Sequence, residues 1–332
     1  MPKRIIFPEK GKVAFDAFDL AKPAANEVIV RTYYSLISIG TETIILNQKY
    51  DADTHFAKMF SFPQLKTGVQ AVGEIEETGS EVNEFKVGDM IFMRQAHGSH
   101  QVIPASACSP VPEKIDLKSA CWCGLAKTAF RAAWAGRFEL GKDVLIIGAG
   151  PVGQMAIRWA SATGVSSIAV VDMAESRLEH AVQGGATLSI NKGIADAEEE
   201  VKSINNGLGP QIVVDTTGNS LVFSHALSVA GQYGKIIILG DTGYPSEQCL
   251  SSDVMTKGLT IQATHDSHDI DGWTQRRIDH LFFEQLKRQK FDLSGLITHE
   301  FSPQDCKSAY SLADENRGET MGILYDWTRN DW

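Results

Sequence analysis

The chain has few of the features that mark several large classes of protein. It has only five cysteines, and they are scattered along the sequence: Cys108, Cys121, Cys123, Cys249 and Cys306. An odd, dispersed set favours reduced thiols over a disulfide framework. No segment approaches the roughly 20 apolar residues of a membrane span, and the first residues lack the apolar core of a signal peptide. We therefore expect a soluble, cytoplasmic protein.

Basic residues are also in deficit. The sequence has 31 Lys and Arg against 41 Asp and Glu, a net charge of −10, and no block of basic residues. Nucleic acids and anionic membrane surfaces attract basic patches, so we expect neither as a partner.

What the chain does contain is enough apolar sequence for two cores. Its 332 residues, 43% of them hydrophobic, exceed what one core usually fills. Over roughly the first 120 residues, short alternating segments are punctuated by Gly and Pro, which predicts a small β-rich lobe. The candidate strands there are residues 27–31, 69–76, 89–93 and 100–103.

From residue 142 the pattern changes to apolar strands that alternate with amphipathic helices. This alternation predicts an α/β domain with a doubly wound, six-stranded parallel sheet. The candidate strands are residues 144–147, 168–171, 187–190, 212–214, 236–239 and 259–263. A later helix at 275–288 and a last strand at 322–327 are too small to fold alone, so we expect them to pack on the first lobe. The predicted division is 1–124, 125–264 and 265–332.

A glycine-rich segment joins the first of these six strands to a helix. Gly148 permits a tight turn, Gly150 lets the backbone approach a pyrophosphate, and Gly153 lets the helix pack closely on the strand. Pro151 and Val152, between the last two glycines, open the helix whose N-terminus faces the anion. The context of strand, turn and helix predicts a dinucleotide site of the Rossmann type.

The second strand ends at Asp172, about 20 residues beyond the glycines, where a carboxylate can accept hydrogen bonds from the adenosine ribose. Because this carboxylate repels a 2′-phosphate, we predict NAD over NADP as the cofactor. Arg177 lies close enough to weaken that argument, or it is a helix residue over the adenine. Thr216 and Gly240, after the fourth and fifth strands, are expected at the carboxyl edge beside the cofactor, although the turn after Asp215 can also be an ordinary strand ending.

The order of motifs resembles the medium-chain dehydrogenase/reductase superfamily over nearly the whole chain. Three stretches are similar to successive sequence motifs of that family's catalytic lobe, and a fourth is similar to the C-terminal segment that rejoins this lobe. They are residues 68–75, 86–91, 98–104 and 295–310. The resemblance implies a Rossmann domain plus a GroES-like, β-rich catalytic lobe, and hydride transfer between nicotinamide and an alcohol or ketone. It also implies a homodimer or homotetramer joined at sheet edges, with the stretch 240–258 as a candidate contact.

The sequence departs from the family where the zinc ligands are expected. The stretches that correspond to the ligand motifs read Ile39-Gly-Thr-Glu, Gly-Val69-Gln and, less securely aligned, Cys123-Gly-Leu. A catalytic zinc needs three donor side chains and an open position, so Ile39 and Val69 remove the site as the family builds it. The four cysteines of the structural zinc are missing as well. We predict no metal, with a rebuilt site from His97, His100 and Cys123 as the alternative.

Residues 37–42 are also similar to a stretch in zinc-lacking members of the family, including the bacteriochlorophyllide dehydrogenases. That similarity covers about a dozen residues. It supports secondary-alcohol chemistry without zinc but does not imply a tetrapyrrole substrate.

Without zinc, side chains must move the hydroxyl proton and stabilise charge on the substrate oxygen. Thr41 occupies the place of the family's relay hydroxyl, or it is a turn hydroxyl that bonds local backbone. Glu42 is a candidate base, a hydrogen-bond acceptor for a substrate hydroxyl, or a buried structural carboxylate. The last two reactive candidates lie further along the chain. Lys127 either polarises a carbonyl or lies on the surface, and His265 either shuttles protons, oriented by Asp266, or is an exposed loop residue.

Thr128 is predicted on the nicotinamide side. The polar set of candidates favours a polyol or sugar-like alcohol or ketone as the small-molecule substrate. Two other functions stay open: a zinc-free quinone or enoyl reductase that uses NADPH, and a non-catalytic dinucleotide-binding sensor.

Overall fold

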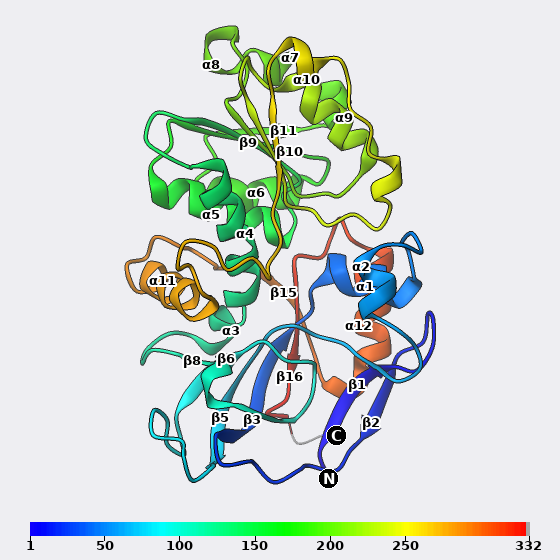
Figure 1. Cartoon of the computed structure of the whole chain (residues 1–332), viewed down its shortest axis with the longest axis vertical. Coiled ribbons are helices and arrows are strands. Elements are labelled where there is room, and N and C mark those ends of the chain that lie inside the picture. Colours follow the sequence, from blue (N-terminus) through cyan, green and yellow to red (C-terminus); the bar gives the residue numbers. More distant parts are fainter. Residues whose placement is uncertain (330–332) are drawn as a thin grey trace.

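The computed structural model, which describes residues 1–329, has two lobes stacked along its long axis (Figure 1). The upper lobe contains a six-stranded sheet, and the lower lobe contains a seven-stranded and a three-stranded sheet. Long helix α4 (Cys123–Gly136) and helix α11 (Gln275–Lys287) lie between them (Figure 1). No helix among the described residues is long and apolar enough to cross a bilayer.

The six-stranded sheet confirms the predicted Rossmann fold. Its strand order is β11-β10-β9-β12-β13-β14, and all five neighbouring pairs are parallel. Each strand falls within two residues of its predicted range, and the apolar residues of the central strands β9, β10 and β12 are buried on both faces. The strands are β9 (Asp143–Ile147), β10 (Ser167–Asp172), β11 (Leu188–Asn191), β12 (Ile212–Asp215), β13 (Lys235–Ile238) and β14 (Thr260–Ala263).

Helices cover both faces of this sheet, as a doubly wound topology requires. Along β9, Val144 and Ile146 join the core under α4 and α5, whereas Leu145 and Ile147 join the core under α7 and α9. The helices of this lobe are α5 (Pro151–Thr163), α6 (Glu175–Gln183), α7 (Ile194–Lys202), α8 (Ile204–Gly207), α9 (Ser220–Val229) and α10 (Asp253–Thr256).

The lower lobe is built on a sheet with the order β15-β16-β3-β5-β6-β8, in which β7 also pairs with β3. The second sheet has the order β2-β1-β4. The strands of the larger sheet are β3 (Glu27–Leu36), β5 (Ala71–Thr78), β6 (Met90–Met93), β7 (His100–Pro104), β8 (Cys108–Pro110), β15 (Ile297–Phe301) and β16 (Gly322–Asp326). Those of the smaller sheet are β1 (Lys3–Phe7), β2 (Ala14–Ala17) and β4 (Leu65–Lys66).

The described segment after β14 contacts both lobes. Strand β16 pairs antiparallel with β3 of the lower lobe, and α12 (Cys306–Glu315) packs there against α1 (Ile39–Asn47). Helix α11 instead buries Ile278, Phe282 and Phe283 in the core around α4. The remaining helices of the lower lobe are α2 (His55–Met59) and α3 (Leu117–Ala120).

The sequence did not predict α1, which occupies the stretch interpreted as a turn around Thr41. This segment is helical because Ile39, Ile45 and Leu46 all pack into the lower core. Thr41 therefore lies in the first turn of a helix.

Candidate functional site

The glycine loop has the geometry that a dinucleotide requires. Gly150 caps α5 and Pro151 occupies its first turn, so the free backbone N–H groups of the helix start face the loop. Gly148 has φ = 93°, a left-handed conformation that favours glycine. A Cβ on Gly153 would collide with the carbonyl oxygen of Gly148. A Cβ on Gly150 would meet only Arg177, at 3.6 Å, so that side of the loop has room for a ligand.

Asp172 lies at the end of β10 and also organises this loop. Its Oδ2 accepts the N–H of Ala149 at 2.7 Å, and its Oδ1 accepts the N–H of Ala174 at 2.8 Å. Each carboxylate oxygen can accept a second hydrogen bond, so the side chain is oriented and still able to bind ribose hydroxyls. These residues fit a bound NAD(P).

Arg177 reaches across to the C-terminal segment. Its Nη1 lies 3.9 Å from Asp172 Oδ2, and its Nη2 donates to the carbonyls of Arg317 and Thr320. Burial lowers the pKa of Arg177, against the opposing effect of Asp172. The guanidinium therefore ties α6 to residues 317–320 beside the expected adenosine position.

Thr216 and Gly240 lie at the carboxyl edge, as predicted. The Thr216 hydroxyl is 2.9 Å from the carbonyls of both Ile147 and Gly148, so it holds the start of the glycine loop. A Cβ on Gly240 would collide with the backbone at Thr216 and Gly218. Both residues thus shape the backbone at this edge of the sheet.

The positions that correspond to the family's zinc ligands do not form a metal site. Ile39 is 5% exposed and lies in the lower apolar core. Val69 is half-buried, and its neighbour Gln70 is fully buried, with its Oε1 accepting the N–H of Leu125 at 3.2 Å. Burial raises the pKa of the Cys123 thiol well above its usual value, and a hydrogen bond to Asp279 raises it further. Two aliphatic side chains and a neutral thiol do not fit zinc.

Glu42 is the third of its predicted alternatives, a buried structural carboxylate. It is 1% exposed and accepts the backbone N–H of Ser38 at 2.7 Å and the hydroxyls of Thr67 and Tyr310. His97 Nε2 lies 3.3 Å from its Oε2. Burial alone would raise the pKa of Glu42, but His97 and these hydrogen bonds outweigh it, so the pKa is lowered. The roles of base and of acceptor for a substrate hydroxyl are wrong, because these protein donors enclose the carboxylate.

The alternative metal site at His97, His100 and Cys123 is not assembled. His97 Nδ1 lies 2.8 Å from Ser35 Oγ, while His100 faces Glu76 at 3.5 Å and Cys123 faces Asp279. Each of the three side chains thus has a different partner.

Lys127 is buried, so its surface interpretation is wrong. It is 4% exposed on α4, and its Nζ lies 3.6 Å from Asp266 Oδ1. Arg94, which directly follows β6, places Nη2 2.6 Å from Asp266 Oδ2. Asp266 therefore pairs with two cations. The sequence suggested that it orients His265, and the structure does not show that contact. Sequence reasoning missed Arg94 because a single arginine after a short strand gives no pattern. Nearby, the Thr128 hydroxyl donates to Gly124 O at 3.1 Å.

His265 lies in a different cluster at the rim between the lobes. His55 Nε2, from the lower lobe, lies 3.0 Å from Oδ2 of Asp241, which directly follows Gly240. The His55 and His265 rings lie 5.6 Å apart edge to face. His55 and Asp241 were missed because they belong to no motif and lie far apart in the sequence.

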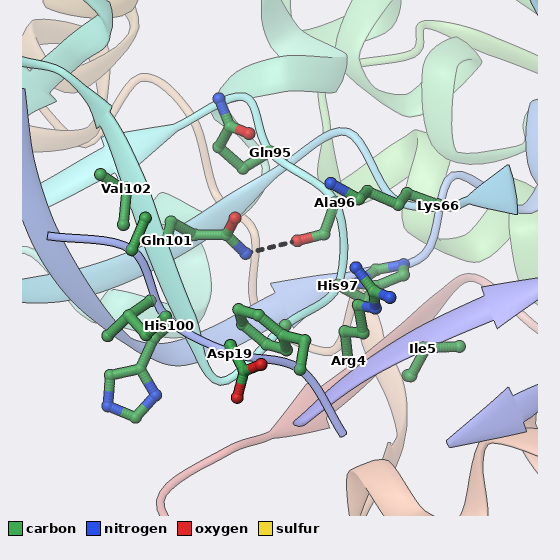
Figure 2. Close-up of a pocket in the computed structure, with 14 residues that line it drawn as sticks. Arg4, Ile5, Asp19, Lys66, Gln95, Ala96, His97, His100, Gln101 and Val102 are labelled. Atoms are coloured by element: carbon green, nitrogen blue, oxygen red, sulfur yellow. Dashed lines mark hydrogen bonds between the residues drawn. The ribbon is translucent and has the colours of Figure 1, made fainter. Parts of the chain in front are cut away.

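A pocket of about 570 Å³ lies elsewhere, on the lower lobe (Figure 2). Arg4, Lys66, His100 and Gln101 line it, and Gln101 Nε2 donates to the Ala96 carbonyl at 2.8 Å. None of its lining residues comes from the six-stranded sheet. It is therefore separate from the dinucleotide edge.

Two sequence families match successive parts of the chain. Residues 24–146 match the alcohol dehydrogenase GroES-like domain, and residues 151–275 match the zinc-binding dehydrogenase family. The chain is 27% identical over 344 residues to the L-threonine 3-dehydrogenase of Paraburkholderia xenovorans (strain LB400), which covers 93% of this chain and 95% of that protein.

Solved structures share the fold over the whole length. An oxidoreductase/dehydrogenase of unknown specificity from Escherichia coli superposes with a TM-score of 0.86 at 21% identity, covering 98% of this chain and 99% of the other. Zinc dependent alcohol dehydrogenase 2 from Streptococcus pneumonia superposes with a TM-score of 0.85 at 19% identity, covering 100% and 99%. At these identities the likeness establishes the two-lobed architecture alone.

Proposed function

The chain belongs to the zinc-type medium-chain dehydrogenase/reductase superfamily, whose members are dinucleotide-dependent oxidoreductases, and from that membership we propose a more specific activity. The protein transfers a hydride between NAD(H) and a secondary alcohol or ketone, and it does so without the catalytic zinc of its superfamily. The observation that carries the proposal is the contrast between an intact glycine loop and a zinc position filled by Ile39 and a protonated Cys123.

The cofactor choice rests on Asp172. Its carboxylate is fixed by two backbone amides at the end of β10, where it favours two ribose hydroxyls over a 2′-phosphate. Arg177 does not offset this preference, because its guanidinium also binds carbonyls of residues 317–320.

Bound NAD(H) supplies the hydride acceptor or donor, and the chain supplies the groups around the substrate oxygen. Lys127, buried and positively charged, stabilises negative charge that develops on that oxygen. Asp266, shared with Arg94, holds the Lys127 ammonium in place. The Thr41 hydroxyl, partly exposed in the first turn of α1, relays the hydroxyl proton toward solvent. Thr128 lies one residue from Lys127 on α4 and faces the nicotinamide side. These polar groups suit a polyol or sugar-like substrate.

Domain division and assembly complete the proposal. We place the catalytic lobe at 1–124 and 265–332 and the nucleotide lobe at 125–264. Strand β14 is an edge strand of the six-stranded sheet, and the segment before it exposes Tyr244, Leu250 and Met255 at 40%, 68% and 85%. Exposed apolar residues beside an unpaired edge support a homodimer or homotetramer that associates through this edge. The proposed location of the protein is the cytoplasm.

The test is a panel of alcohols, polyols, ketones, quinones and enones, assayed with NAD(H) and NADP(H) before and after exhaustive chelation. We expect turnover of a secondary alcohol or its ketone with NAD(H), retained after chelation. Lys127→Met and Lys118→Met form a matched pair, because each removes one positive charge and only Lys127 belongs to the proposed site. We expect kcat to fall by about 100-fold in Lys127→Met alone.

Three results would contradict the proposal in distinct ways. Activity lost on chelation and restored by zinc would overturn zinc-free chemistry. Reduction of quinones or enones with NADPH would assign the protein to the other reductase branch. Tight NADH binding without turnover of any compound would indicate a sensor.

A further inference from the structure

We propose that His55, Asp241 and His265 form a binding site for one divalent transition-metal ion of the zinc class, at the rim where the two lobes meet. This site is distinct from the superfamily's zinc position at Ile39 and Cys123, and it does not depend on the proposed reaction.

The three side chains already stand within reach of a single ion. One ligand atom from each lies within 4.8 Å of the other two, and within residues 1–329 no other group of three His, Cys, Asp or Glu side chains meets this condition. His55 Nε2 and Asp241 Oδ2 are 3.0 Å apart. Atoms that bind one zinc at about 2.0–2.2 Å are themselves roughly 3.3 Å apart, so only small side-chain movements would complete the site.

Hydrogen bonds hold the segments that carry His55 and Asp241 together without any ion. His55 begins α2, which is capped by the Thr54 hydroxyl. Just before it, Asp51 N donates to Gly243 O at 2.7 Å and Ser246 Oγ donates to Asp51 Oδ2 at 2.6 Å. These bonds cross between the lobes and keep α2 against the loop that carries Asp241. The site is therefore largely formed in advance, which lowers the entropy lost on binding.

The side chains also suit a metal. His265 Nδ1 lies 2.7 Å from Ser267 Oγ and accepts the Ser267 N–H at 3.2 Å, so these contacts fix the ring through Nδ1 and an ion would bind through Nε2. Two imidazoles and one carboxylate favour Zn²⁺, Co²⁺ or Fe²⁺ over Mg²⁺ or Ca²⁺, which prefer oxygen ligands. Three protein ligands leave one position open to water or to an oxygen of a bound molecule.

The position of the site gives the ion a structural consequence. Asp241 follows Gly240 at the carboxyl edge of the nucleotide sheet, and His55 belongs to the other lobe. An ion bound here would link the lobes directly above the dinucleotide edge and would stabilise the folded protein according to its concentration.

The test uses the metal-free, full-length protein and measures binding without turnover. Isothermal titration with Zn²⁺ is expected to give one tight equivalent, and Co²⁺ is expected to give the visible absorption of a four- or five-coordinate site with nitrogen and oxygen ligands. His55→Ala, Asp241→Asn and His265→Ala should each weaken binding by about 100-fold. Zn²⁺ should raise the Tm of the wild type but not of these variants.

His268→Ala is the matched control. His268 is an exposed neighbour of His265, and its Nδ1 accepts the His265 N–H at 3.2 Å, so it is not among the three ligands. Its variant should bind Zn²⁺ within about threefold of the wild type. Absence of a stoichiometric equivalent in the wild type would overturn the site. Undiminished binding in His55→Ala, or an equal loss in His268→Ala, would do the same, because binding would then belong to exposed histidines in general.

Discussion

The carboxyl edge of the nucleotide sheet and the buried face of α1 in the lower lobe differ in how they use polar residues. At the sheet edge, Asp172 and Thr216 bond the backbone of the glycine loop and leave an open surface above it. On the face of α1, Glu42 and His97 bond to each other and to neighbouring hydroxyls, and both are 1% exposed or less. One region presents its polar groups to a ligand, and the other encloses them.

This difference corresponds to two sites of the superfamily, the dinucleotide site and the catalytic zinc site. The dinucleotide edge depends on backbone geometry, which three glycines and one carboxylate determine. The superfamily's zinc site depends on donor side chains, and Ile39 and Val69 stand where two of them are expected, which supports the proposed zinc-free reaction. The buried network at Glu42 belongs to the same lobe.

The largest expected effect lies at the sheet edge. In Gly153→Val, the new side chain collides with the Gly148 carbonyl and displaces the loop that faces the pyrophosphate. We expect NADH binding to weaken by at least about 100-fold, or ~2.7 kcal/mol, as measured by quenching of NADH fluorescence. Gly40→Val is the control, because Gly40 lies on α1 of the lower lobe and a Cβ there meets nothing within 4 Å. Unchanged affinity for NADH in Gly153→Val would mean that NADH does not bind against the glycine loop.

The sequence predicted the sheet edge better than the lower lobe for a physical reason. Gly148, Gly150 and Asp172 act through the backbone of consecutive elements, so their spacing in the sequence reflects their geometry. The lower lobe brings together Thr67, His97 and Tyr310 around Glu42 from distant segments. No local pattern records such contacts, and α1 itself was missed because its packing, not a strong amphipathic pattern, determines it.

The next effect is on stability. Glu42→Gln keeps the side chain's size but removes the charge that Tyr310 and His97 face, so the free energy of unfolding should fall by about 2 kcal/mol at pH 7 in urea titrations. Because the pKa of Glu42 is lowered from 4.5, its contribution is present above pH 4.5 and is lost as pH falls below that value.

The wild type should therefore converge on the Glu42→Gln variant in acid. Glu300→Gln, which breaks a half-buried pair with Lys118, is the matched control and should cost about 0.5 kcal/mol. If Glu42→Gln lowered the free energy of unfolding no more than this control does, the Glu42 network would contribute little to stability. The enclosed face of α1 would then differ from the sheet edge only in its accessibility to solvent.

The smallest effect concerns thiol reactivity, which reports directly on enclosure. Burial raises the pKa of Cys108 to about 12 and that of Cys306 to about 11, and it raises those of Cys121 and Cys123 as well, whereas Cys249 is exposed. Iodoacetamide at pH 8 should therefore modify one thiol of five in the native protein, by mass spectrometry, and Cys249→Ser should abolish this rapid reaction. Urea-unfolded protein, with all five thiols reactive, provides the reference. Rapid labelling of Cys123 would mean that this position is open to solvent and that its thiolate is available to a metal, which would contradict the contrast between the two regions.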